Sequence, residues 1–228
     1  MPKITLVCSA HRESGLCNAH ELFAILRSIA PDVIFEEVRD AAQLEHYLRL
    51  GNVEASAIAR YREVKRIREV PVDRYDIPHH LLFEMKSGFD RVLGLVNARS
   101  GDYRQFEDEH DSSVFRRGFG YLNSVACSTI SDKLSKLEDK IVAEAGDLDL
   151  LLALKQWREL MRRREVGMVR AIYQYARSNT FEGGAFLVGA AHRTDMIKLI
   201  STYVAAEAGQ IEWSYYDGEQ VSQLPPSV

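Results

Sequence analysis

Short apolar runs near opposite ends of the chain predict two buried strands. Residues 185–188 are continuously apolar, residues 4–7 are apolar apart from Thr5, and both runs are too short for amphipathic helices. Strands that are buried on both faces, as in parallel sheets, have this pattern. Each run is followed by small residues and then by a histidine, which is His11 in the first case and His192 in the second.

These two histidines are the first candidate site residues. If both strands lie close together in one parallel sheet, His11 and His192 reach its carboxyl edge, where open α/β sheets bind their ligands. Thr194 and Asp195 are good N-cap residues, so we expect a helix to begin beside the second histidine. A histidine after a strand is often only a loop residue, but two such segments favour a shared site.

The stretch after the first histidine predicts a helix and a second strand. A capping-box pattern at Asn18 opens an amphipathic helix. Residues 32–37 then have the composition of a strand, which ends in the acids Glu36 and Glu37. Because side chains alternate across a sheet, only one of these two acids can point where His11 points.

Two helical patterns follow, at residues 41–50 and 53–67, and lead to a short strand. This strand ends in Asp73 and Arg74. The two charged residues are either a surface ion pair, which contributes little to stability, or a site acid beside a positioning arginine. The acidic run at residues 105–111 is most typical of a solvated loop.

Two long helices are predicted ahead of the second histidine. Ser131 can cap the first, which ends near Gly146, and the second covers about residues 147–178. Glu165 lies in the centre of the apolar stripe of the second helix, and Arg164 lies at the edge of this stripe. A charge in a buried stripe is unfavourable unless it is paired, so both are functional candidates unless the stripe leaves the core at this point.

Together these elements predict an α/β fold. We expect a mostly parallel central sheet flanked by helices, with a lobe of long helices inserted before the last core strand. A chain of 228 residues that is 46% apolar and 27% charged can form one such domain. The expected boundaries are residues 1–228 for the domain and residues 112–180 for the helical lobe within it.

Charge, hydropathy and cysteine content argue against several classes of protein. A net charge of −4 gives no electrostatic case for a nucleic-acid partner, and no apolar run approaches the roughly 20 residues that span a bilayer. No signal-peptide pattern opens the sequence, so we expect a cytoplasmic protein. The cysteines lack CxxC spacing, which argues against a disulfide framework or structural zinc. Cys8 is either a nucleophile beside His11 or, preferably, a buried packing residue.

Five short motifs resemble, in order and spacing, those of the TraB/Tiki superfamily, which is related to erythromycin esterases and haem-binding ChaN proteins. The motifs are residues 8–11, Glu36, Glu63 ahead of Asp73 and Arg74, residues 164–168, and residues 189–192. Together they cover most of the chain. Cys8 stands where this family has glycine, and Glu165 stands where it has asparagine or aspartate.

This resemblance implies a hydrolase acting on a peptide or a small molecule. In the metalloprotease-like branch, His11, Glu36 and His192 bind a divalent metal ion. Water bound to such a metal loses its proton near neutral pH and cleaves an amide or ester bond. Glu63 then acts as the general base.

Two other interpretations follow from the same resemblance. In the esterase-like branch no metal is needed, since His11 is the general base and Glu36 or Glu63 sets its tautomer and pKa. In either branch, Arg74 or Arg164 stabilises an oxyanion or orients a carboxylate. Alternatively, the pocket binds haem, a peptide or a signalling ligand without turnover, and the long helices form a homo-oligomer.

Overall fold

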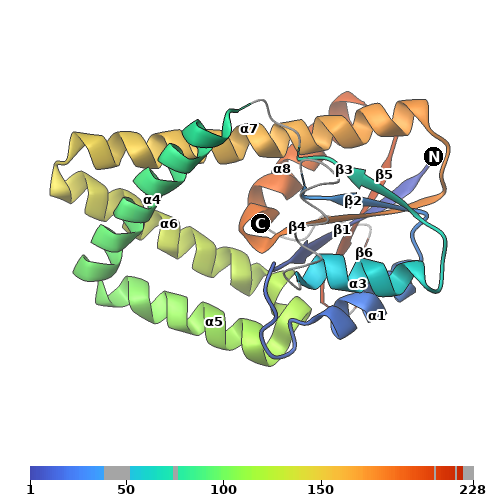
Figure 1. The fold of residues 1–228 in the computed structure, drawn as a ribbon, viewed down its shortest axis with the longest axis horizontal. Coiled ribbons are helices and arrows are strands. Elements are labelled where there is room, and N and C mark those ends of the chain that lie inside the picture. The colour runs from blue at the N-terminus through green and yellow to red at the C-terminus, as the bar shows by residue number, and fades with distance from the viewer. Residues whose placement is uncertain (39–51, 74–76, 208, 219, 223–228) are drawn as a thin grey trace.

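A six-stranded sheet forms the centre of the molecule (Figure 1). The computed structural model describes residues 1–38, 52–73, 77–207, 209–218 and 220–222. In spatial order the strands are β3 (Arg68–Pro71), β2 (Val33–Glu36), β4 (Gly183–Gly189), β1 (Lys3–Ser9), β5 (Glu212–Tyr216) and β6 (Val221–Ser222). β6 pairs antiparallel and the other pairings are parallel. The expected α/β fold with a mostly parallel sheet is therefore confirmed.

The two strands that precede the histidines are neighbours in this sheet. β1 and β4 pair in parallel from Lys3 opposite Gly183 to Ser9 opposite Gly189. Because their ends lie at the same level, the segments that carry the two histidines leave the sheet next to each other. The adjacency on which a shared site depends is therefore present.

Helices cover both faces of the sheet and extend beyond its carboxyl edge (Figure 1). α1 and α3 cover one face, while α8 and the last part of α7 cover the other. α4, α5, α6 and the first part of α7 form a helical lobe that begins earlier than the expected residue 112. The bounds are α1 (Ala19–Ile29), α3 (Val53–Arg62), α4 (His79–Arg99), α5 (Gly101–Leu122), α6 (Val125–Ala145), α7 (Leu148–Ser178) and α8 (Arg193–Ala206).

Successive side chains of each inner strand enter two different cores. Phe35 belongs to the core under α7 and α8, whereas Ile34 belongs to the core under α1 and α3. Cys8 and Val7 divide in the same way on β1. Both faces of these strands are buried, as the continuous apolar runs predict.

Several predicted helix ends are confirmed. Asn18 caps α1, and its side chain accepts a hydrogen bond from the backbone N–H of Glu21 at 3.0 Å. Asp147 caps α7, which then continues without interruption to Ser178. Gly146 ends α6 in the left-handed conformation that favours glycine.

Two local predictions in the helical lobe are wrong. Residues 105–111 lie inside α5 rather than in a loop, because most of the acidic side chains in this run project into solvent from one side of the helix. α6 begins at Val125 under the cap residue Ser124, so Ser131 lies within the helix instead of capping it.

The helix after β4 also begins earlier than predicted. A short 3₁₀ turn, η1 (Ala190–His192), leads directly into α8. Thr194 and Asp195 therefore lie in the first turn of α8 and do not cap it. The predicted helix at residues 41–50 and the candidate Arg74 lie outside the described residues.

A buried asparagine joins the helical lobe to the end of β1. β5 pairs with β1 only as far as Leu6. Beyond that point Asn123, in the turn between α5 and α6, occupies the edge of β1: its Oδ1 accepts from the Cys8 N–H at 2.7 Å and its Nδ2 donates to the Cys8 carbonyl at 2.9 Å. This pair of bonds takes the place of a strand.

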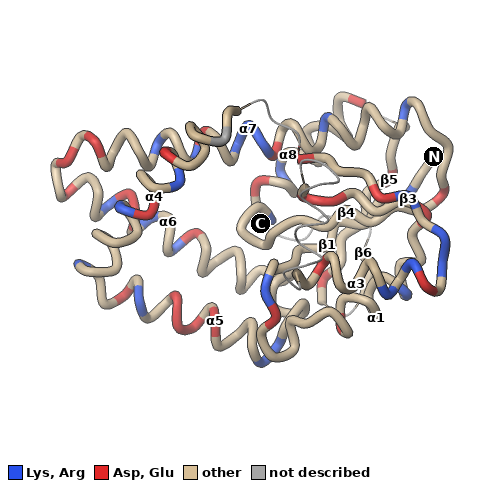
Figure 2. Tube along the Cα trace, viewed as in Figure 1, with Lys and Arg blue, Asp and Glu red and all other residues tan. Residues whose placement is uncertain are grey.

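The helical lobe has a hydrophobic core of its own. Its members include Val92 and Val96 of α4, Tyr103 of α5, Val142 of α6 and Leu154 of α7. Figure 2 shows acidic and basic positions interspersed along these helices. Within the described part of the chain, no helix combines the length and the apolar character that a membrane crossing requires.

A glycine kink in α5 supports the loop that carries the first histidine. Gly118 has φ +50° and ψ −130° within the helix. A Cβ at this position would lie 2.3 Å from the carbonyl oxygen of Leu16. Nearby, the Leu16 N–H donates to the carbonyl oxygen of Phe115 at 2.9 Å. The loop after β1 is therefore in close backbone contact with α5.

We predict that Gly118→Ala lowers the free energy of unfolding by about 1–3 kcal/mol, since the side chain meets both an unfavourable φ and a backbone oxygen. Urea unfolding followed by circular dichroism measures this change. Gly94→Ala in α4 is the matched control, because no atom lies within 4 Å of a Cβ at Gly94. The control should be neutral or stabilising by up to about 1 kcal/mol, and equal losses in both variants would contradict the prediction.

Candidate functional site

The two histidines converge at the last residue of β4. A Cβ on Gly189 would lie 3.9 Å from His11 Nε2, 3.9 Å from His192 Cδ2 and 3.3 Å from Glu37 Oε2. His11, His192 and Glu37 therefore all lie around Gly189, and a side chain there would be tightest against Glu37. His11 comes from the loop after β1 and His192 from η1, as their places at adjacent strand ends imply.

His192 is buried between two carboxylates. Its Nδ1 lies 2.6 Å from Glu165 Oε1, and its Nε2 lies 3.3 Å from Glu37 Oε1. Burial opposes the charged imidazole, but the hydrogen bonds and charges of Glu165 and Glu37 outweigh it and raise the pKa of His192 to about 9. His192 is therefore an imidazolium at neutral pH. Glu165, in the centre of the stripe of α7, is buried and paired, as the sequence predicts.

Arg164 connects Glu37 to Asp73 at the end of the sheet. Its Nη2 lies 2.8 Å from Glu37 Oε1 and 2.7 Å from Asp73 Oδ2. Burial disfavours the Glu37 carboxylate, but His192, Arg164 and the N–H of Gly189 outweigh this effect and lower its pKa to about 2. Glu37 also accepts a hydrogen bond from the Gly189 N–H at 2.7 Å. Glu37 is consequently a fixed anion at the centre of the cluster.

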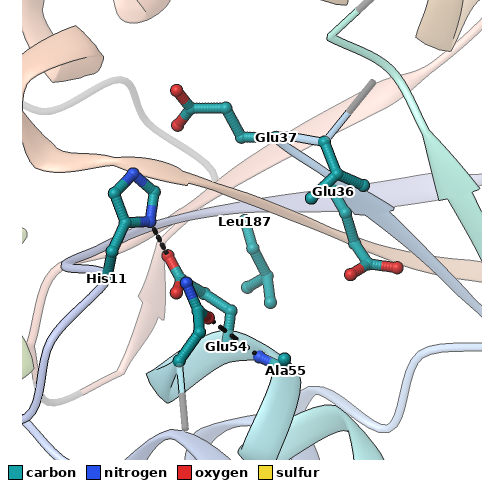
Figure 3. Close-up of a pocket in the computed structure, with 8 residues that line it drawn as sticks. His11, Glu36, Glu37, Glu54, Ala55 and Leu187 are labelled. Atoms are coloured by element: carbon teal, nitrogen blue, oxygen red, sulfur yellow. Dashed lines mark hydrogen bonds and ion pairs between the residues drawn. The ribbon is translucent and has the colours of Figure 1, made fainter. Parts of the chain in front are cut away.

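His11 is bound by a different carboxylate. Its Nδ1 lies 3.1 Å from Oε1 of Glu54, in the first turn of α3, and the same oxygen accepts a hydrogen bond from Ser9 Oγ at 2.6 Å (Figure 3). The N–H of Val53 donates to the carbonyl oxygen of His11 at 3.3 Å. The hydrogen bond to Glu54 raises the pKa of His11, while partial burial opposes the rise. About half of the His11 side chain (51%) is exposed.

Glu36 lines a small cavity together with His11, Glu37 and Glu54. Figure 3 shows its carboxylate directed away from His11 and from the Glu37 carboxylate. Its Oε1 is buried and has no hydrogen-bond partner among the described residues. Burial, with smaller contributions from Glu69 and Glu54, raises the pKa of Glu36 to about 8, so it is a neutral acid at pH 7. The two acids at the end of β2 therefore face opposite sides of the sheet.

The other candidates divide into those inside the site and those outside it. Asp73, Arg164 and Glu165 are inside, as described above. Glu63 is exposed at the end of α3, ahead of β3, and thus lies toward the amino edge of the sheet. Arg74 lies outside the described residues. Glu54 was not a candidate from the sequence, although its place just after a predicted helix start was a signal for it.

Cys8 is a packing residue. It is buried in the core under α7 and α8. Burial raises the pKa of its thiol to about 12, so the thiolate that a nucleophile requires does not form at neutral pH. The interpretation of Cys8 as a nucleophile beside His11 therefore has no support in this structure.

The histidines open onto a cleft of about 620 Å³ between the sheet edge and the helical lobe. His11, Glu37, Gly189 and His192 line it on the sheet side. The other side is formed by residues of all four lobe helices, among them Phe89, Tyr103, Leu134, Trp157 and Met161. Its volume is in the range of clefts that bind small organic ligands.

The predicted metal ligands His11, Glu36 and His192 do not fit one metal ion. Both ring nitrogens of His192 already lie within 3.3 Å of carboxylate oxygens, whereas a ligand imidazole must offer a lone pair. The Glu36 carboxylate is directed away from His11 (Figure 3). Across the described residues, no group of three or more histidine, cysteine, aspartate or glutamate side chains is arranged to hold a metal.

Comparison with known proteins found no matching family model, no matching curated protein and no matching solved structure. The resemblance to the TraB/Tiki superfamily consequently depends on the five motifs alone. In this fold, four of those motifs contribute residues to one cluster: the histidines of the first and last motifs, Asp73 of the third and Arg164 with Glu165 of the fourth.

We predict that Glu165→Gln makes the unfolding free energy depend less strongly on pH. The folded-state pKa of His192 is raised from 6.5 to about 9, so its contribution to stability is complete below 6.5 and is lost as the pH rises through 9. Loss of one buried partner should lower stability by about 3 kcal/mol near pH 6. That difference from wild type should shrink toward pH 10, as measured by urea unfolding.

Glu159→Gln is the control for this series. Glu159 is an exposed carboxylate on the same helix, and its hydrogen bonds with Arg162 and Arg163 lower its pKa to about 2. Its charge is therefore constant between pH 6 and pH 10. A Glu165→Gln deficit that stays constant over this range would show that the raised pKa of His192 does not depend on Glu165.

Proposed function

We propose that this protein is a hydrolase that cleaves an ester or amide bond in the cleft, with His11 as the general base toward water. The observation that carries the proposal is the hydrogen bond between His11 Nδ1 and Glu54 Oε1, at the mouth of a cleft and beside Gly189. A carboxylate bound to one ring nitrogen fixes the tautomer and makes the other nitrogen the basic one.

The proposed step is the attack of water on a carbonyl carbon held near Gly189. As the water oxygen bonds to this carbon, its proton passes to His11 Nε2. His11 then returns the proton to the ester oxygen or amide nitrogen as the bond between that atom and the carbon breaks, which releases the alcohol or amine and leaves the acid. Glu54 stabilises the imidazolium that exists between these two transfers. Ser9, which donates to the same oxygen of Glu54, acts as a positioning residue for it.

The buried cluster on the other side of Gly189 has a positioning role in this proposal. Glu37 accepts from the Gly189 N–H, and its own position is fixed by His192 and Arg164. The cluster pairs two cationic groups, Arg164 and His192, with three carboxylates, so both of its cations are held within it. Arg164 is engaged by two carboxylates, which supports positioning rather than direct binding of an oxyanion.

The esterase-like interpretation is therefore preferred over the metal-dependent one. The three expected metal ligands do not converge, because the Glu36 carboxylate is directed away from His11 and both ring nitrogens of His192 lie beside carboxylates. The general base of the esterase-like scheme, in contrast, has the carboxylate partner that it requires. The partner is Glu54 rather than either of the expected Glu36 and Glu63. No step of the proposed reaction needs a metal ion.

We predict that His11→Ala lowers ester or amide hydrolysis by about 100-fold or more, because it removes the general base. A panel of chromogenic esters and peptide amides, assayed with the purified protein, provides the measurement. Glu63→Gln is the control, since Glu63 is exposed and away from the cleft, and its activity should equal that of wild type.

Dialysis against EDTA should leave the wild-type activity unchanged. Loss of activity on chelation, with recovery when a divalent metal is returned, would overturn the metal-independent scheme in favour of the metal-dependent one. Equal activity of wild type and His11→Ala would overturn the assignment of the base.

We predict that Glu54→Gln moves the rising limb of the pH–rate profile to lower pH. The hydrogen bond from Glu54 is the main cause that raises the pKa of His11, so neutralising it lets His11 lose its proton at lower pH. The plateau rate should also fall by at least about tenfold, because the imidazolium loses its counter-charge. A profile of kcat/KM from pH 5 to pH 9 measures both effects, and a fall in rate with no shift of the limb would contradict the prediction.

A further inference from the structure

The cleft has an apolar wall opposite the histidines. Phe89 of α4 and Trp157 of α7 stack with their ring centroids 5.0 Å apart and their planes at 10°. Met161 of α7 and Leu134 of α6 line the same cleft, and all four are only partly buried. Half-exposed apolar side chains that share one concave surface are typical of a ligand site.

The charges of the lobe side are already paired. Arg158 of α7 lies 3.1 Å from Glu138 Oε2 and 2.5 Å from Asp139 Oδ1, and it also donates to Ser135 Oγ at 2.9 Å. Tyr103 donates to the other oxygen of Glu138 at 3.4 Å. A charged ligand here would have to break these pairs or lose its own hydration without compensation.

The charges of the sheet side are paired in the same way. Arg164 has Glu37 and Asp73, and His192 has Glu37 and Glu165. Burial lowers the pKa of His110, which lines the cleft from α5, so this residue is neutral at pH 7. Among the described residues that line the cleft, each ionised side chain thus has an oppositely charged partner.

We propose that the substrate is an ester or amide whose larger part is uncharged and apolar and lies against Phe89, Leu134, Trp157 and Met161. This inference rests on the proposed hydrolase function and adds the class of its substrate. The scissile bond lies near Gly189 and His11, and the apolar part extends along the helical lobe. Anionic substrates such as phosphorylated or carboxylate-bearing compounds are not accommodated, and neither are organic cations.

The kinetic test uses p-nitrophenyl esters of increasing acyl length, from acetate to octanoate. We expect kcat/KM to rise by about threefold to fourfold for each added methylene until the cleft is filled. Esters of the same length that end in a carboxylate or an ammonium group should lose this gain. A flat length series, or a charged ester that reacts as well as the neutral one, would overturn the proposal.

Substitutions in α7 test whether the rise of kcat/KM with acyl length arises at the apolar wall. Trp157→Ala should remove most of the gain with acyl length, and Trp157→Phe should restore much of it. Leu152→Ala is the matched control: this residue is on the same helix, is exposed and lines a different groove. If Leu152→Ala and Trp157→Ala reduce the gain equally, the apolar wall is not the binding surface.

A binding measurement separates the substrate class from the reaction. The neutral fluorescent probe N-phenyl-1-naphthylamine should bind wild type and His11→Ala equally, and about tenfold more weakly to Trp157→Ala. Binding without hydrolysis of any ester would retain the apolar site and reject the hydrolase. Hydrolysis without probe binding, and without dependence on acyl length, would retain the hydrolase and reject the apolar substrate.

Discussion

The parallel pairing of β1 with β4 is the constraint from which the site follows. It joins segments as distant as Ser9 and Val188, which are 179 positions apart in the chain. Since the two strands end at the same level, the loop with His11 and the turn with His192 must share one edge of the sheet. Gly189 lies at this edge, and a Cβ there would be in contact with both histidines.

Two kinds of carboxylate–histidine contact at this edge have opposite consequences. His192 is buried and is bound by Glu165 and Glu37. It keeps its proton at neutral pH, so it is suited to a structural role. His11 is half-exposed, is bound by Glu54 and lines the cleft, so its ring is accessible to a molecule there. Solvent access, rather than residue type, therefore distinguishes the two histidines.

The sequence predicted the strands, α7 and the burial of Glu165, because apolar periodicity reports burial directly. It also showed that Glu36 and Glu37 must diverge, but not which one faces the histidines, since both faces of β2 are buried and equally apolar. Glu54 lies in the first turn of α3 and Glu63 at its other end. Only the contact of the first turn with His11 shows that Glu54, and not Glu63, is the carboxylate partner of this histidine. Such choices depend on contacts between distant segments, which local patterns do not encode.

Asn123 has a consequence for how this architecture can vary. Its two bonds to Cys8 complete the edge of β1 from within the helical lobe. Deleting the lobe, or replacing it with a short loop, would leave a buried backbone N–H and carbonyl unsatisfied, at a cost of about 1–3 kcal/mol each. The lobe is therefore not an interchangeable module. A chain that has another helical insertion in its place must supply an equivalent amide beside Cys8, the second-last residue of β1.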